Sequence, residues 1–203
     1  MSDLKINNIT DRTGSSGPVI AGVSTVTPTG SFVVPVGPTE MRGGRGRGIL
    51  VGGSTPTNLN TIEYITIATT GDGTDFGDIR AQRASPSVCS SSTRAIVAGG
   101  YHTTYHNTID YVTISSGGGA STFGELVSPT GYGGACASST RGIIAGGWNL
   151  RGTTGPASAN DPRNNNIIEF VTIASTGNAL DFGDMTAAKN QVQGTSDVHG
   201  GLG

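Results

Sequence analysis

RGILVGG (residues 47–53), RAIVAGG (residues 94–100) and RGIIAGG (residues 141–147) are three versions of one heptapeptide, each 47 residues after the one before. Self-similarity at a fixed period of this size indicates a repeat architecture, in which each copy forms one supersecondary unit. Each copy opens on an arginine, continues with apolar residues and closes on two glycines, as a short strand that ends in a turn does. The heptapeptide therefore predicts three equivalent β units.

A second motif follows each heptapeptide in the same register and has apolar residues on both faces of a predicted strand. Its copies are TIEYITIATTG, TIDYVTISSGG and IIEFVTIASTG, at residues 61–71, 108–118 and 167–177. In the middle copy Ile109 and Tyr111 point to one face, and Val112 and Ile114 to the other, since side chains alternate along a strand. A strand that is apolar on both faces must be covered on both, so we expect the units to stack face to face.

A third motif completes the unit and sets its size. DFGDI, TFGEL and DFGDM begin at residues 75, 122 and 181, and a serine-rich stretch then leads to the next arginine. Four short strands in a unit of this length are typical of a β-propeller blade. We therefore expect an all-β fold of three four-stranded propeller-type units. Their bounds are about residues 47–93, 94–140 and 141–203, the last with an insertion at residues 148–166.

The composition agrees with an all-β chain and excludes several classes of protein. The 203 residues include 34 glycines and only 13% charged residues, and Thr, Ile and Val are abundant, as in short strands punctuated by turns. A formal net charge of −2 is too small to steer the molecule to nucleic acid. No apolar stretch is long enough to cross a membrane, and we do not expect MSDLKINNIT (residues 1–10) to be a secretory signal, because it has no apolar core.

Residues 1–44 lie outside the repeat and are predicted to form a separate segment before the repeats at 45–203. They contain SSGPV and PVGPTE, with one predicted strand at residues 31–36. MRGGRGRG (residues 41–48) is interpreted as a flexible joint. Its arginines also resemble a nucleic-acid-binding segment, but no aromatic residues are interleaved with them, which favours a linker.

The sequence resembles a family of kelch-like structural proteins of tailed bacteriophages, notably those that infect cyanobacteria. The resemblance rests on INNITDRTGSSGPVIAG (residues 6–22), GSFVVPVGPTEMRGGRGRG (residues 30–48) and SDVHGGLG (residues 196–203). The repeat core, with NTIDYVTI at residues 107–114 and the DFGD motif, is similar to the blade of that family. The resemblance covers essentially the whole chain.

The resemblance implies a virion component, made in the bacterial host cytoplasm, that is associated with the tail or a fibre. Residues 1–44 would attach to other virion proteins, and the blades would face outward. A capsid decoration protein and a module that recognises host-surface glycans are the alternatives. Related chains often carry more repeats, and three blades fall short of the four to eight of a closed propeller. We therefore expect a homo-oligomer, a dimer before a trimer.

One cation and one acid recur in each unit and suggest a repeated structural ion pair, within a blade or between neighbouring blades, with a ring facing a ligand as the alternative. The arginine opens the first strand, and the acid occupies one equivalent position of the second. The two series are Arg47, Arg94 and Arg141, and Glu63, Asp110 and Glu169. Such pairs fix geometry more than they add net stability when half-buried.

The insertion at residues 148–166 contains the sole tryptophan of the chain. Long loops on a rigid scaffold often carry binding, and an exposed aromatic ring is a platform for a sugar. Trp148, with Arg151 and Arg163, is therefore a candidate glycan site. Trp148 is equally interpretable as a plug at the interface between two units.

The sequence contains no constellation typical of an enzyme, a metal site or a cofactor site. DFGD is interpreted as a phenylalanine packed between strands, since the other kinase motifs are missing. Cys89 and Cys136 occupy matching positions and are predicted to be small packing residues. His102 and His106 lack an evident third ligand. We therefore expect a protein that is not an enzyme and that needs no metal or cofactor.

Overall fold

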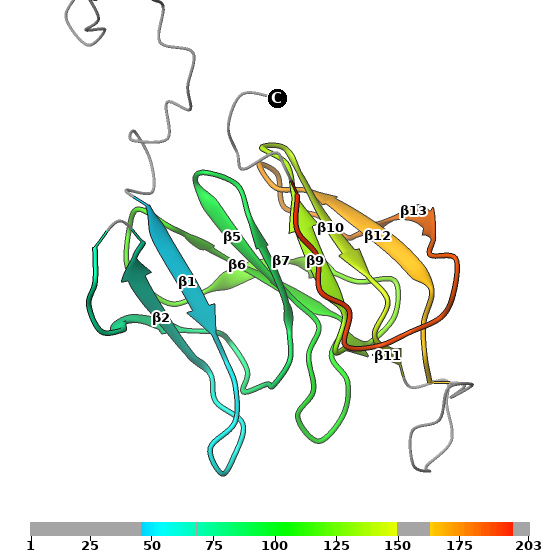
Figure 1. Ribbon diagram of the computed structural model, residues 1–203, viewed down its shortest axis with the longest axis horizontal. Helices are drawn as coiled ribbons and strands as arrows, with labels where there is room; N and C mark the ends of the chain where they lie inside the picture. The colour runs from blue at the N-terminus through cyan, green and yellow to red at the C-terminus, as the bar shows by residue number, and fades with distance from the viewer. Residues whose placement is uncertain (1–45, 68, 150–162, 197–203) are drawn as a thin grey trace, which may run out of the picture. The chain divides into compact units, whose positions relative to one another are not determined.

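The computed structural model describes residues 46–67, 69–149 and 163–196, all within the second unit of the chain, Pro38–Gly203. Their regular secondary structure consists of antiparallel strands (Figure 1), which confirms the all-β prediction. The predicted attachment segment, residues 1–44, lies outside the described residues. The strands are β1 (Arg47–Val51), β2 (Thr61–Thr66), β3 (Thr74–Asp78), β4 (Ser87–Ser90), β5 (Arg94–Ala98), β6 (Thr108–Thr113), β7 (Ser121–Glu125), β8 (Thr130–Gly131), β9 (Gly134–Ala137), β10 (Arg141–Ala145), β11 (Trp148–Asn149), β12 (Ile167–Thr172) and β13 (Leu180–Asp184).

Three of the sheets are built on one plan. The first sheet has the strand order β1-β2-β3, the second β4-β5-β6-β7 and the third β9-β10-β12-β13, while β8 and β11 form a separate ribbon. The register repeats as well, because each heptapeptide arginine pairs with a threonine at the end of the next strand of its sheet. These pairs are Arg47 with Thr66, Arg94 with Thr113, and Arg141 with Thr172.

The serine-rich strand belongs to the sheet of the arginine that follows it. β4 pairs with β5 and β9 pairs with β10, so the second and third sheets begin before the arginine at which the sequence repeat was taken to start. The reason is a tight turn between β4 and β5, in which Ser91 N donates to Arg94 O at 2.9 Å. Antiparallel strands joined by so short a turn pair with each other.

Two apolar clusters hold the three sheets together face to face. The first and second sheets share Ile62, Phe76, Ile79, Ala95, Val97, Val112 and Ile114. The second and third sheets share Cys89, Ile96, Ala98, Ile109, Phe123, Leu126, Ile144, Val171, Ile173 and Ala179. Strand β6 is thus buried on both faces, as its sequence predicts, and burial of each large side chain contributes roughly 1.5–3 kcal/mol.

Candidate functional site

A pocket of about 680 Å³ lies where the three repeats meet. Its walls come from three equivalent segments, residues 85–88, 132–135 and 191–194. The first two lead into β4 and β9, which lie next to each other, and the third follows β13. One equivalent stretch of each repeat therefore contributes to one concavity.

Each wall of this pocket begins with a residue in the left-handed backbone region. Ser85, Tyr132 and Gln191 have φ angles of 50°, 61° and 53°. This region is uncommon for residues other than glycine and costs of order 1–3 kcal/mol each. Hydrogen bonds from one repeat to the next stabilise this backbone conformation. Tyr132 N donates to Ser85 O at 3.1 Å, and Gln191 N donates to Tyr132 O at 2.7 Å.

The third wall packs against β9 at backbone distance. A Cβ added at Gly194 would lie 2.5 Å from Ala135 O, so a side chain there would displace the segment. Two residues later, Ser196 Oγ donates to Ala137 O at 2.6 Å. The segment after β13 therefore follows β9, although it pairs with no strand in the part of the chain that is described.

The pocket lining suits hydrogen bonding to a neutral polar group. The polar side chains are the hydroxyls of Ser85, Ser87 and Tyr132 and the carboxamides of Gln191 and Gln193. Both groups donate and accept hydrogen bonds, whereas no carboxylate, imidazole or thiol is among the described residues of the wall. The sequence analysis missed this site, because residues 85, 132 and 191 share a place in the repeat but not a residue type.

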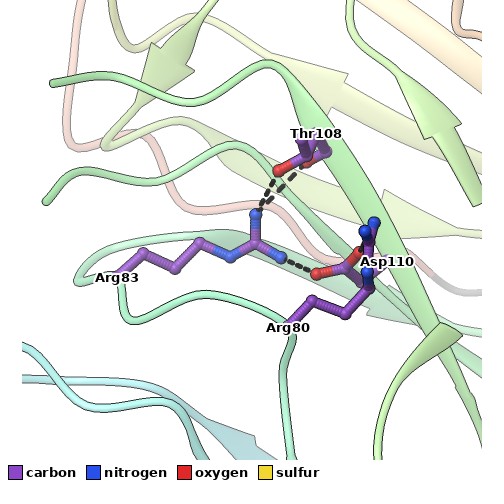
Figure 2. A network of polar contacts seen from close by, with 4 residues as sticks. All are labelled: Arg80, Arg83, Thr108 and Asp110. Atoms are coloured by element: carbon purple, nitrogen blue, oxygen red, sulfur yellow. Dashed lines mark hydrogen bonds and ion pairs between the residues drawn. The ribbon is translucent and has the colours of Figure 1, made fainter. Parts of the chain in front are cut away.

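A buried polar network joins the loop before β4 to strand β6 (Figure 2). The side chains of Arg83 and Asp110 are 0% and 1% exposed and form an ion pair through Nη2 and Oδ2. Arg83 Nη1 donates to Thr108 Oγ1 at 2.6 Å, and Arg80 Nη1 lies 3.8 Å from Asp110 Oδ1. Burial lowers the pKa of Arg83, and Asp110 opposes that shift. A pair without solvent contact fixes the loop and offers no surface to a ligand.

The predicted ion pairs between the arginine and acid series are wrong. In the described residues, the ion pairs are those of Arg80 and Arg83 with Asp110. The register gives the reason: Arg47 is opposite Thr66, whereas Glu63 is opposite Leu50. Residues three apart on a strand point to opposite faces of the sheet, so the two charges of one sheet cannot meet. Between neighbouring sheets, the described residues likewise form no ion pair of the arginine series with the acid series.

Each arginine of the series stacks instead on the aromatic ring of its own sheet. The guanidinium carbon lies 4.6 Å from the Tyr64 ring centre for Arg47, 4.5 Å from Tyr111 for Arg94, and 4.8 Å from Phe170 for Arg141. Such contacts are worth about 0.5–2 kcal/mol.

The acids of the second and third repeats have different partners. Asp110 pairs with Arg83, while Glu169 Oε2 accepts a hydrogen bond from Val127 N at 3.1 Å. Burial raises the pKa of Glu169, which the Val127 hydrogen bond partly offsets.

The Trp148 side chain is packed against other residues of the chain. Trp148 is half-buried, its ring meets Tyr132 at 5.2 Å between centres, and the Arg163 guanidinium lies 4.8 Å from the Trp148 ring centre. Its indole N–H donates to Asn164 Oδ1 at 2.8 Å. These contacts are those of a plug, and Arg151 lies outside the described residues. The glycan site stays a prediction.

The cysteines and histidines form no reactive centre in the described ranges. Cys89 and Cys136 are free thiols, and burial, with a smaller effect of Cys136, raises the pKa of Cys89 to about 12. Cys89 is part of the core, as predicted, and Cys136 is half-buried. His102 Nδ1 lies 3.2 Å from Asn58 Nδ2, and burial lowers the pKa of His106.

Neither a metal cluster nor a membrane-spanning helix is found in the part of the chain described. No three of the His, Cys, Asp and Glu residues there are grouped as metal ligands would be. The same residues include no helix that is long and apolar enough to cross a membrane.

Comparison with known proteins identifies no family for this chain. No protein-family model matches it, and no curated protein matches it.

Proposed function

We propose that this chain is a non-enzymatic structural protein of the virion of a tailed bacteriophage, associated with the tail or a fibre. In this proposal the three sheets are kelch-like propeller blades, and residues 1–44 attach them to other virion proteins. The sequence resemblance supports the virion assignment. The face-to-face stacking of three equivalent sheets supports the propeller.

The observation that carries the proposal is that the packing residues recur in all three repeats, whereas the residues at the pocket differ from repeat to repeat. The stacking arginine, the register and the apolar faces recur in every repeat. The residues that begin the three walls of the pocket change from Ser85 to Tyr132 to Gln191. Packing residues repeat while chemically versatile residues do not, which is the pattern of a scaffold rather than of a repeated reaction centre.

The buried charged residues support the same conclusion. Arg83 and Asp110 neutralise each other out of reach of solvent, and Glu169 binds a backbone N–H of the neighbouring repeat. Buried ionic groups without solvent access serve packing geometry. A perturbed group in a cleft would instead suggest catalysis.

The test is to locate the protein in particles of the phage that encodes it. An antibody raised against residues 46–196 should label purified particles in immunogold electron microscopy, at the tail or fibre. Label on the capsid shell would favour the decoration protein. Particles that lack the protein, by mass spectrometry as well as by labelling, would overturn the proposal.

The attachment segment has its own test. Cells infected with a phage that lacks the gene would be supplied with either the full chain or a chain that lacks residues 1–44. We expect incorporation of the full chain only. Equal incorporation, with the shortened chain shown by circular dichroism to be folded, would contradict the assigned role of residues 1–44.

A further inference from the structure

The two outer faces of the three-sheet stack expose large apolar side chains. On the first sheet, Leu50 is 51% exposed, and Ile67, directly after β2, is 69% exposed. On the third sheet, Leu180 and Phe182 of β13 are 59% and 54% exposed. Exposed apolar patches of this kind mark interaction surfaces.

These faces are the two halves of an interface that the chain already forms twice within itself. Phe182 occupies the place of Phe76 and Phe123, which are 5% and 3% exposed because the next sheet covers them. Ile67 occupies the place of Ile114 and Ile173, which the preceding sheet covers, leaving them 5% and 1% exposed. The outer face of the third sheet, with Phe182, therefore corresponds to one side of the internal interface. The outer face of the first sheet, with Ile67, corresponds to the other side.

Backbone hydrogen bonds accompany both internal interfaces at equivalent positions. In each, two N–H groups of the loop before the last strand donate to the last strand of the preceding sheet. The bonds are Gly118 N to Phe76 O at 2.7 Å, Ala120 N to Asp78 O at 2.8 Å, Gly177 N to Phe123 O at 2.9 Å and Ala179 N to Glu125 O at 2.8 Å.

The two outer faces carry the matching donors and acceptors. The repeat places the acceptors at Phe182 O and Asp184 O, and the donors at Gly71 N and Gly73 N. All four residues are exposed. A strand edge with such groups is a template for pairing with another chain.

A glycine follows the phenylalanine in the last strand of each sheet, and its surroundings show the space that a partner would fill. A Cβ at Gly77 would meet the backbone of the next repeat at 2.6 Å, and one at Gly124 would meet it at 2.1 Å. At the equivalent Gly183 nothing in the described residues lies within 4 Å. The close backbone approach made at both internal interfaces is therefore open at the third.

The stacked arginine gives a third match. Arg47 Nη1 donates to Ile114 O at 2.7 Å, and Arg94 Nη1 donates to Ile173 O at 3.1 Å in the next sheet. The equivalent pair would be Arg141 and Ile67 O. Arg141 belongs to the third sheet and Ile67 to the first, and these two sheets are not neighbours within one chain. The equivalent bond therefore needs the first sheet of another copy.

We propose that a second copy of this chain docks head to tail, so that the third sheet of each copy covers the first sheet of the other. Two copies then form a closed ring of six sheets, within the four to eight of known propellers, and with the twofold symmetry that is commonest among oligomers. Apolar, backbone and arginine contacts all specify the same pairing. The inference rests on these contacts and not on the virion assignment.

The first experiment measures the mass of the full chain by light scattering after size exclusion, at micromolar concentration. We expect twice the 20.4 kDa of one chain. Phe182→Asp and Ile67→Asp each place a charge in the buried interface and should weaken association roughly 100-fold or more. Val127→Asp is the matched control, because Val127 is 64% exposed outside both faces, and it should remain dimeric.

The second experiment mixes the two monomeric variants, one of them labelled with heavy isotopes, and follows them by native mass spectrometry. Head-to-tail docking leaves the third sheet of the Ile67→Asp chain and the first sheet of the Phe182→Asp chain intact. We therefore expect mixed dimers, held by one interface, that neither variant forms alone. Circular dichroism of each variant checks that it is folded.

Four outcomes would overturn the proposal. They are a monomeric full chain at micromolar concentration, an open polymer or trimer in place of the closed pair, a dimer that survives both substitutions, and folded variants that do not associate when mixed. The last outcome would indicate that like faces pair with like, or that another protein covers them.

Discussion

Replacing Asp110 by alanine should destabilise the protein by about 3–5 kcal/mol, because it leaves an uncompensated charge in the interior. Arg83 is 0% exposed, so its guanidinium has no solvent to replace the lost carboxylate. The hydrogen bond to Thr108 Oγ1 satisfies one N–H group but not the charge. For a unit of this size, 1 kcal/mol shifts the melting temperature by about 2–4 °C. The expected fall is therefore on the order of 10 °C.

Differential scanning calorimetry at one fixed protein concentration measures this effect, with two variants as controls. Arg80→Ala removes the ion pair at 3.8 Å from a half-exposed side chain, and exposed pairs contribute about 0–1 kcal/mol. The double variant Arg83→Met, Asp110→Leu removes both charges and should be close to the unaltered protein. An unchanged melting temperature in Asp110→Ala, or a double variant less stable than Asp110→Ala, would refute the reasoning.

Three further predictions follow from single side chains. Burial raises the pKa of Glu169, so its contribution to stability is present below the unfolded pKa and is lost as pH rises through the folded pKa. We therefore compare the melting temperature of Glu169→Gln with that of the unaltered protein at two pH values. The difference, variant minus unaltered protein, should be more positive at about pH 7 than at about pH 4. An equal difference at both pH values would contradict this. Trp148→Ala should lower stability by about 1–3 kcal/mol in urea titration, whereas lost glycan-array binding at unchanged stability would show a sugar platform. Native protein treated with iodoacetamide at about pH 7 should be alkylated at Cys136 before Cys89, because burial raises the pKa of the Cys89 thiol to about 12. Peptide mass spectrometry measures the order of labelling, and faster labelling of Cys89 would show that its thiol is accessible.

Much of the fold could be predicted, because its determinants are local. The 47-residue period and the alternation of Ile109, Tyr111, Val112 and Ile114 were sufficient to predict equivalent β units with a strand buried on both faces. The buried DFG-type phenylalanines Phe76 and Phe123 follow from the same pattern, since a large apolar residue in a half-buried strand packs inward.

The arginine contacts and the candidate site could not be predicted in this way. Whether Arg47 meets Glu63 or Tyr64 depends on which residues are paired across β1 and β2, and a one-residue change of register reverses every face. The pocket depends on three segments far apart in the chain, residues 85–88, 132–135 and 191–194, that share a position in the repeat but not a residue type. Arg83 is replaced by Thr130 in the second repeat and by Lys189 in the third, so the arginine itself does not recur, and Glu169 binds a backbone N–H instead.

The sequence by itself determined that the chain is a β repeat with apolar strands and a fixed unit length, because strand periodicity and turn residues act between near neighbours. The tertiary structure decided which serine-rich strand joins which sheet, which face each charge occupies, and which buried groups meet. Those outcomes depend on contacts between residues distant along the chain, where packing and desolvation, rather than residue type, select the partner.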